Sequence, residues 1–178
     1  DVAKSGQGSL RIDDIDATVE EFKAAVERAE KAGFDVIEIH AAHGYLLNQF
    51  YSPLSNYRTD EYGGTLENRI RFHLEIIEGI RKELGSDYPI ALRLGACDYT
   101  ENGSTINDAI KAAKLFEKAG VDLLDISGGF NGYIIPNVTH QGYFSDVTKA
   151  IKKEVSIPVL CAGGIIDPET AETLLLEN

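Results

Sequence analysis

The sequence KAGFDVIEI at residues 31–39 returns, little changed, as KAGVDLLDI at residues 118–126. Each copy ends a helical pattern at a glycine, Gly33 or Gly120, and then enters a short apolar run that is typical of a buried strand. A second pair follows the same order, because a proline, five intervening residues and a glycine span residues 89–95 and again residues 158–164. The repeating unit is therefore two strands and two helices, used twice.

Strands and helices alternate along the rest of the chain. Continuous apolar runs predict strands at residues 35–40, 89–95, 122–127 and 158–162. Helical periodicity predicts helices before the first strand and at residues 65–84, 105–119, 145–154 and from 167 onward. Uninterrupted apolar strands that alternate with helices indicate an α/β fold, in which helices cover a parallel sheet.

The start of the first helix is ambiguous. Thr18, with Glu21 three residues later, forms a possible capping box, whereas Asp13 or Asp16 could begin the helix earlier.

Because the two-strand unit is repeated, strands of two sequence types alternate along the chain. This pattern is typical of a (β/α)8 TIM barrel, in which odd and even strands fill different layers. A complete barrel takes ~250 residues. Four strands in 178 residues therefore predict a partial TIM barrel, about half of one, as a single domain over residues 1–178. The chain begins at Asp1 and stops at Asn178 directly after an amphipathic stretch. We therefore expect it to be a fragment of a longer barrel.

Alternation within the strands places charged side chains on one face. The apolar side of each strand must face the helices, so Glu38, Arg93 and Asp125 are expected to point together into the barrel interior. An unpaired guanidinium there would cost several kcal/mol, on the order of the penalty for any buried charge. Arg93 must therefore meet an anion or hydrogen-bond acceptors, and an ion pair with Glu38 or Asp125 is one solution.

The first strand ends in three polar rings within six residues: His40, His43 and Tyr45. Two neutral imidazoles can donate hydrogen bonds to one ligand oxygen, and a tyrosine hydroxyl can serve as a general acid. The alternatives are a metal-binding pair, which lacks a third ligand at matching spacing, or two structural histidines beside a packing tyrosine.

Gly163-Gly164 ends the last strand before a helix opens, and backbone N–H groups at such a turn can bind a phosphate. A plain turn is the alternative, and Ser127 with the two glycines after it is equally ambiguous. The loop that ends at Gly64 is long, which is typical of functional loops. Asn68, Arg69 and Arg71 follow it and are expected to hold it by hydrogen bonds.

The composition excludes several partners. A net charge of −12 argues against nucleic acid and against an anionic membrane. Cys97 and Cys161 lie far apart and match no metal spacing, so we expect reduced thiols in a cytoplasmic protein with no bound metal. No apolar run approaches the ~20 residues of a membrane span, and the N-terminus does not resemble a signal peptide.

Several motifs together resemble the Old Yellow Enzyme family, the FMN-dependent NAD(P)H oxidoreductases and ene-reductases. They are HAAHGYL at residues 40–46, residues 50–56, RTDEYGG at residues 58–64, ENR at residues 67–69 and the strand that carries Arg93. The resemblance covers essentially the whole chain. It implies a (β/α)8 barrel with FMN at its C-terminal mouth, of which this chain supplies the fourth to seventh strands.

The resemblance also implies roles for single residues. His40 and His43 correspond to the substrate-binding histidines, and Tyr45 to the proton donor. Arg93 corresponds to the arginine at the N1–C2=O edge of the flavin, and Gly163-Gly164 to one arm of the FMN phosphate site. The implied reaction uses NADH or NADPH to reduce FMN. Hydride then passes to the β-carbon of an activated alkene (an enone, an enoate or a dienoyl thioester), and Tyr45 protonates the α-carbon.

Parts of the family pattern are missing from this sequence. The first three strands and the last strand with its phosphate clamp are absent, so we expect the chain alone to bind FMN weakly or not at all. Two copies could pair through the exposed barrel edges as a homodimer. Two other functions stay open: a metal-assisted TIM-barrel hydrolase that uses His40 and His43, and a catalytically inactive fragment without cofactor.

Overall fold

The computed structural model describes residues 10–130, 132–135 and 137–177. Its centre is a four-stranded sheet in the order β1-β2-β3-β4, with every pair of neighbours parallel. The strands are β1 (Ile37–Ala41), β2 (Ile90–Cys97), β3 (Leu123–Gly128) and β4 (Val159–Cys161). Order in space follows order in sequence, as when each strand is joined to the next by a crossover helix. The predicted parallel α/β arrangement is confirmed.

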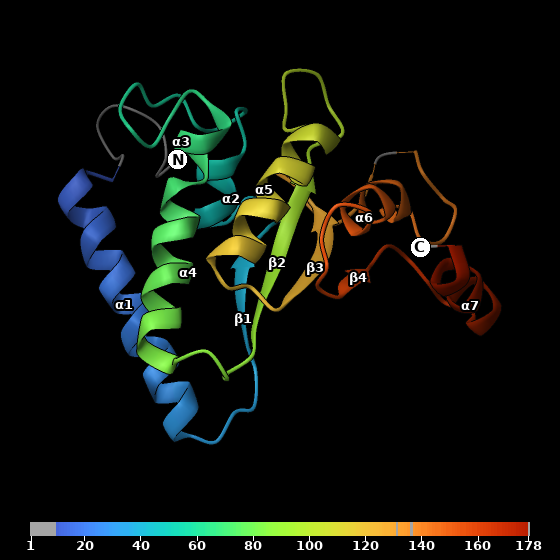
Figure 1. Cartoon of the computed structure of the whole chain (residues 1–178). Coiled ribbons are helices and arrows are strands. Elements are labelled where there is room, and N and C mark those ends of the chain that lie inside the picture. The colour runs from blue at the N-terminus through green and yellow to red at the C-terminus, as the bar shows by residue number, and fades with distance from the viewer. Residues whose placement is uncertain (1–9, 131, 136, 178) are drawn as a thin grey trace.

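The main helices pack in a row along one face of this sheet (Figure 1). They are α1 (Ile12–Lys31), α4 (Arg71–Leu84), α5 (Ile106–Ala119) and α6 (Ser145–Lys152). The last helix, α7 (Pro168–Glu177), has no buried residue within its bounds and lies beyond β4. Among the described residues, no helix is long and apolar enough to cross a membrane.

The core lies between the helices and the sheet. Ile90, Leu92 and Leu94 alternate along β2, and all three are fully buried on the helix side. Small residues on α5 allow that helix to approach the strands closely, and they are buried together with isoleucines of α4: Ala109, Ala112, Ala113, Ile76, Ile77 and Ile80. Each buried isoleucine contributes roughly 1.5–3 kcal/mol of transfer free energy. As predicted, the apolar side of the strands faces the helices.

The first helix begins earlier than a Thr18 cap would require. Helix α1 starts at Ile12, and the Asp14 carboxylate accepts a hydrogen bond of 2.9 Å from the backbone N–H of Arg11. The Thr18 hydroxyl instead donates to the Asp14 carbonyl inside the helix. The capping box at Thr18 was therefore wrong. Acidic residues in the first turn, Asp13 and Asp14, explain the earlier start because they interact favourably with the helix dipole.

The connection from β1 to α4 holds two short helices, α2 (Leu46–Tyr51) and α3 (Leu66–Arg69). Residues 65–84, predicted as one helix, are divided at the fully buried Ile70, where φ is −96° and ψ is −2°. Thr65 caps α3, since its hydroxyl accepts the N–H of Asn68 at 3.3 Å. Helix α2 was not predicted, because six residues are too few for a clear helical period.

Candidate functional site

Four residues in register form a row across the sheet on the face opposite the helices. His40 of β1 lies beside Arg93 of β2, Arg93 lies beside Asp125 of β3, and Asp125 lies beside Leu160 of β4. Neighbours in register point to the same side of a sheet, so we call this side the inner face. Glu38 lies two residues before His40 and therefore belongs to the same face.

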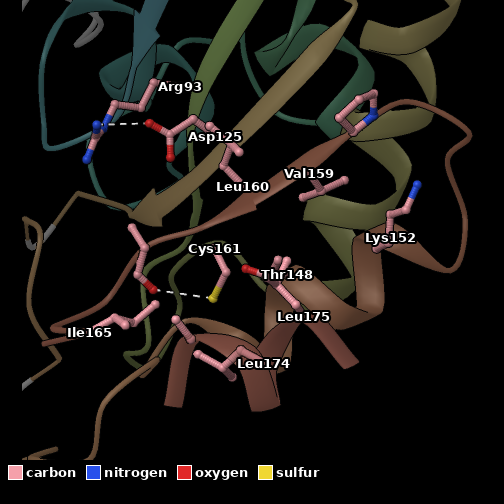
Figure 2. A pocket seen from close by; sticks show the side chains of 13 residues that line it. Arg93, Asp125, Thr148, Lys152, Val159, Leu160, Cys161, Ile165, Leu174 and Leu175 are labelled. Carbon is pink, nitrogen blue, oxygen red and sulfur yellow. Dashed lines mark hydrogen bonds and ion pairs between the residues drawn. The ribbon is translucent and has the colours of Figure 1, made fainter. Parts of the chain in front are cut away.

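Arg93 pairs with Asp125 rather than with Glu38. Its Nη1 donates to Asp125 Oδ2 at 2.9 Å, as Figure 2 shows. Burial raises the pKa of Glu38, and the negative charge of Asp125 raises it further. The positive charge of Arg93 lowers that pKa but does not cancel the increase. The Nε of Arg93 is buried and has no hydrogen-bond partner among the described residues. The guanidinium is therefore anchored at one corner and retains an N–H group for another acceptor.

The three predicted rings lie together. The ring centroid of His40 is 5.2 Å from that of His43 and 5.2 Å from that of Tyr45, with edge-to-face geometry in both pairs. Burial lowers the pKa of both histidines, and the positive charge of Arg93 lowers it further. The imidazoles are thus biased toward their neutral forms, in which each carries one N–H donor. Tyr45 is 63% exposed.

A tight reversal of the backbone brings these rings together. His43 has a left-handed φ of 58°, and Gly44 follows with a φ of 75°. The N–H of Gly44 donates to Oδ1 of Asn48 at 2.8 Å, and Asn48 is fully buried in α2. Tyr45 is the N-cap residue of α2. The short helix therefore fixes the backbone position from which the Tyr45 side chain extends. The sequence did not predict this helix.

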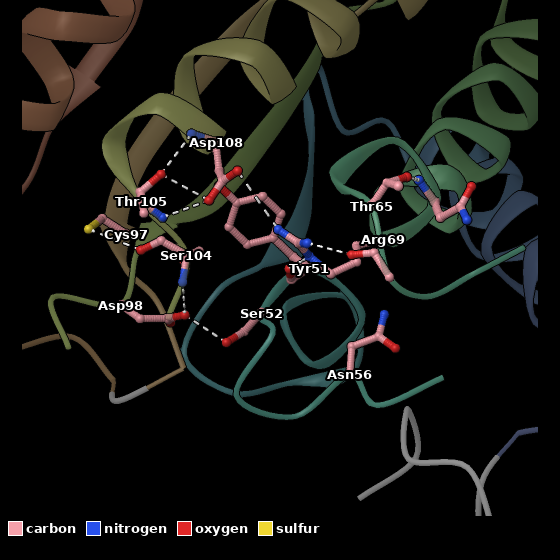
Figure 3. A network of polar contacts seen from close by, with 12 residues as sticks. Tyr51, Ser52, Asn56, Thr65, Arg69, Cys97, Asp98, Ser104, Thr105 and Asp108 are labelled. Carbon is pink, nitrogen blue, oxygen red and sulfur yellow. Dashed lines mark hydrogen bonds and ion pairs between the residues drawn. The ribbon is translucent and has the colours of Figure 1, made fainter. Parts of the chain in front are cut away.

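Asp98 joins three segments around this loop, as Figure 3 shows in part. Its carboxylate accepts hydrogen bonds from the Ser52 hydroxyl at 2.6 Å, the Ser104 N–H at 2.7 Å and the Phe130 N–H at 2.6 Å. The side chain is 3% exposed. The carbonyl of Phe130 would lie 3.2 Å from a Cβ at Gly44. Asp98 therefore fixes the segment that packs on the histidine loop, and the sequence analysis missed it.

The predicted hydrogen bonds that hold the long loop are present. Asn68 Nδ2 donates to the Gly63 carbonyl at 2.9 Å, and Arg71 Nε donates to the Glu61 carbonyl at 2.8 Å. Arg69 Nε reaches the carbonyl of Tyr51 at 2.8 Å. The break at Ile70 separates the two arginines, so that each can bond back to the loop.

The two glycines after β4 adopt conformations that favour glycine. Gly163 has a φ of 119° and Gly164 a φ of 67°. The Gly163 carbonyl accepts the N–H groups of Gly142 and Tyr143 at 2.6 and 3.3 Å, and a Cβ at Gly163 would lie 2.8 Å from the Tyr143 nitrogen. Close packing by Tyr143 is therefore one reason for the glycines, and their binding of a phosphate stays a prediction.

A cavity of about 690 Å³ runs along β4 toward α7, with Arg93 and Asp125 at one end (Figure 2). Its lining is otherwise mostly apolar and includes Leu160, Leu174 and Leu175. Within the described part of the chain, no group of three His, Cys, Asp or Glu side chains could hold a metal ion. The hydrolase alternative thus finds no third ligand there for His40 and His43.

Comparison with known proteins identifies relatives along almost the whole sequence. The model of the NADH:flavin oxidoreductase / NADH oxidase family matches residues 4–178. An NADPH dehydrogenase of Bacillus subtilis (strain 168) is 47% identical over 90% of this chain and 47% of its own length. An NADH oxidase of Thermoanaerobacter brockii is 42% identical over 95% of this chain and 27% of its own length. The chain thus spans about half or less of these relatives.

Solved structures agree with this assignment. A 2-naphthoyl-CoA reductase in complex with 2-naphthoyl-CoA has a TM-score of 0.88 at 32% identity, covering 99% of this chain and 28% of that one. An old yellow enzyme homologue from Zymomonas mobilis has a TM-score of 0.74 at 28% identity, covering 94% of this chain and 46% of that one. The predicted partial (β/α)8 barrel is confirmed, and so is the resemblance to old yellow enzymes. The chain belongs to the NADH:flavin oxidoreductase / NADH oxidase family, whose cofactor is FMN and whose reductant is NADH or NADPH.

Proposed function

We propose that this chain forms the substrate-binding side, and part of the flavin-binding side, of an enzyme that reduces activated C=C bonds. The observation that carries the proposal is the cluster of His40, His43 and Tyr45, whose rings lie edge to face at the carboxyl end of β1 beside Arg93. Active sites of parallel barrels form at this end of the strands.

The inner face suits a flavin. Arg93 has a buried N–H at Nε without a partner among the described residues, while Asp125 holds another corner of the guanidinium. A planar cation held in this way can donate to the electron-rich N1–C2=O edge of the isoalloxazine ring. FMN, when bound, would supply a hydride received from NADH or NADPH. The positive charge of Arg93 would stabilise the negative charge that the isoalloxazine ring carries after reduction.

The histidines suit a carbonyl substrate. Two neutral imidazoles that donate to one carbonyl oxygen withdraw electrons from a conjugated alkene, so its β-carbon becomes a better hydride acceptor. The lowered pKa of both rings keeps them neutral at physiological pH. Tyr45, exposed beside His40, would give its hydroxyl proton to the α-carbon and regain one from water. One hydride and one proton complete the reduction of the double bond.

Gly163 and Gly164 are proposed as one arm of the phosphate site. The turn they form precedes α7, and amides near a helix N-terminus attract anions. Tyr143 packs against both glycines on the side where a Cβ would lie. Since the chain supplies part of such a barrel, we expect weak FMN binding by the chain alone. We also propose that two copies pair through the exposed edges of β1 and β4.

The experiment that tests this function uses the FMN-loaded gene product that contains this chain. Its flavin is reduced with NADPH without oxygen, and 2-cyclohexen-1-one is then added while flavin absorbance is followed. Tyr45→Phe is expected to slow reoxidation by the enone about 100-fold or more, the usual worth of a general acid. Tyr57→Phe, which removes another exposed hydroxyl, should not slow it. Equal rates in both variants would contradict the role of Tyr45, and bound zinc without flavin would support the hydrolase instead.

A further inference from the structure

Ser127, the residue before the last of β3, contacts His43 directly. Its hydroxyl oxygen lies 2.7 Å from His43 Nε2, and the serine is only 1% exposed. A hydrogen bond to one ring nitrogen of a neutral histidine decides which nitrogen carries the proton. The contact with Ser127 therefore determines which ring nitrogen of His43 can donate a hydrogen bond to a ligand.

The proton position on His40 follows from its backbone. The N–H of Ala42 points at His40 Nδ1 over 3.3 Å, and an amide N–H can only donate. Nδ1 of His40 must therefore hold the lone pair. In the neutral ring, the proton is then on Nε2, which is the donor that His40 has available.

The proton position on His43 follows from the burial of Ser127. A buried hydroxyl hydrogen needs an acceptor, since leaving it unsatisfied forfeits its hydrogen bond to water without replacement. His43 Nε2 is the hydrogen-bond partner of the Ser127 hydroxyl among the described residues. If His43 donated to the serine, the buried hydroxyl hydrogen would lack an acceptor within that part of the chain. The hydroxyl therefore donates to Nε2, and the proton of the neutral His43 ring lies on Nδ1.

We propose that Ser127 is a positioning residue that fixes His43 as the Nδ1–H tautomer, so that the two histidines offer complementary donors, Nε2–H of His40 and Nδ1–H of His43. Their edge-to-face packing at 5.2 Å keeps the two rings adjacent. Two donors and no available lone pair select an oxygen acceptor, such as a carbonyl or phenolate oxygen, over a metal ion. The identity of this ligand rests on the proposed function. The assignment of the His43 tautomer does not depend on that function.

The tautomer is measured directly by nitrogen-15 NMR of the histidine rings in the chain without flavin, above the pKa of His43. The expected spectrum shows Nδ1 protonated and Nε2 unprotonated for His43, and the reverse for His40. Ser127→Ala should shift the His43 proton toward Nε2, and Ser127→Thr, which keeps the hydroxyl, should retain the original tautomer. Ser55→Ala is the matched control, because that buried hydroxyl donates to the Gln49 carbonyl and not to a histidine.

A wild-type His43 with its proton on Nε2, or an unchanged tautomer in Ser127→Ala, would overturn the inference. A second measurement separates this result from the proposed function. In the FMN-loaded protein, 4-hydroxybenzaldehyde is titrated while flavin absorbance is followed, and Ser127→Ala should weaken its binding roughly fivefold, the worth of about one hydrogen bond. A shifted tautomer with unchanged binding would confirm the role of Ser127 and contradict the role of His43 in ligand binding.

Discussion

Arg93 and Asp125 join β2 to β3 on the inner face of the sheet, with 2.9 Å between Nη1 and Oδ2. Their side chains are 32% and 11% exposed, so the pair is partly shielded from solvent but not fully buried. A guanidinium in this position needs a fixed acceptor, and Asp125 supplies it. The pair therefore holds Arg93 in place before any ligand arrives.

Replacing Asp125 with asparagine should destabilise the fold by about 1–2 kcal/mol, because it leaves a shielded cation without its counter-charge. Solvent reaches part of Arg93, so the loss is smaller than for a fully buried pair. Urea unfolding at neutral pH measures the change. The matched control is Glu154→Gln, which breaks the more exposed pair between Lys114 and Glu154 and should cost less than about 0.5 kcal/mol. Equal losses in the two variants would contradict the structural role of the inner pair.

His73 makes the fold sensitive to acid. It is fully buried in α4 against Phe116, and neither ring nitrogen has a hydrogen-bond partner among the described residues. Burial lowers its pKa to about 3, against an ordinary value of ~6.5. As the pH falls below the ordinary value, the unfolded chain binds this proton and the folded chain does not, so stability is lost progressively down to the folded pKa.

His73→Phe removes this titration while keeping a ring beside Phe116. Between pH 7 and pH 5, the wild-type chain should lose about 2 kcal/mol more of its free energy of unfolding than the variant does. Urea unfolding at the two pH values measures the difference. His140→Gln, at an exposed histidine, should follow the wild type. A His73→Phe variant with the wild-type pH dependence would show that His73 is not buried as a neutral ring.

Asp98 should control the mobility of the segment beside the histidine loop. Asp98→Asn replaces a carboxylate that accepts from Ser52, Ser104 and Phe130. We expect a loss of about 2–3 kcal/mol, because hydrogen bonds to charged acceptors are strong and buried donors lose their partner. Amide hydrogen exchange measures it locally: the N–H groups of Ser104 and Phe130 should exchange faster. The exposed Asp87→Asn should leave both rates unchanged, and slow exchange in Asp98→Asn would contradict the assignment.

Much of the fold follows from local sequence. The proline-to-glycine runs at residues 89–95 and 158–164 became β2 and β4 within a few residues, because continuous apolar runs bounded by Pro and Gly leave little choice. The inward direction of Arg93 followed from strand alternation alone. Its choice of Asp125 over Glu38 did not, because this depends on strand register: Asp125 lies directly beside Arg93, whereas Glu38 lies beside Ala91.

The missed features share a physical cause. Asp98 accepts the backbone N–H of the distant Phe130, and Asn48 accepts the N–H of Gly44 across a left-handed turn; neither contact leaves a periodic signal in the chain. Ser127 was noticed only for the glycines beside it, since its contact with His43 arises when β1 and β3 are folded into one sheet. The division of residues 65–84 at Ile70 was missed because the apolar spacing continues through it. Tertiary packing decided each of these positions.

Arg93 is proposed to face the flavin, and His40 and His43 are proposed to face its substrate. The most direct measurement is the flavin content of the FMN-loaded gene product after gel filtration, together with its affinity for 4-hydroxybenzaldehyde, in Arg93→Gln and in His40→Ala/His43→Ala. We expect Arg93→Gln to lose flavin, and the double variant to keep its flavin but to bind the phenol at least tenfold more weakly. Loss of flavin from the histidine variant, with full retention in Arg93→Gln, would contradict this proposal.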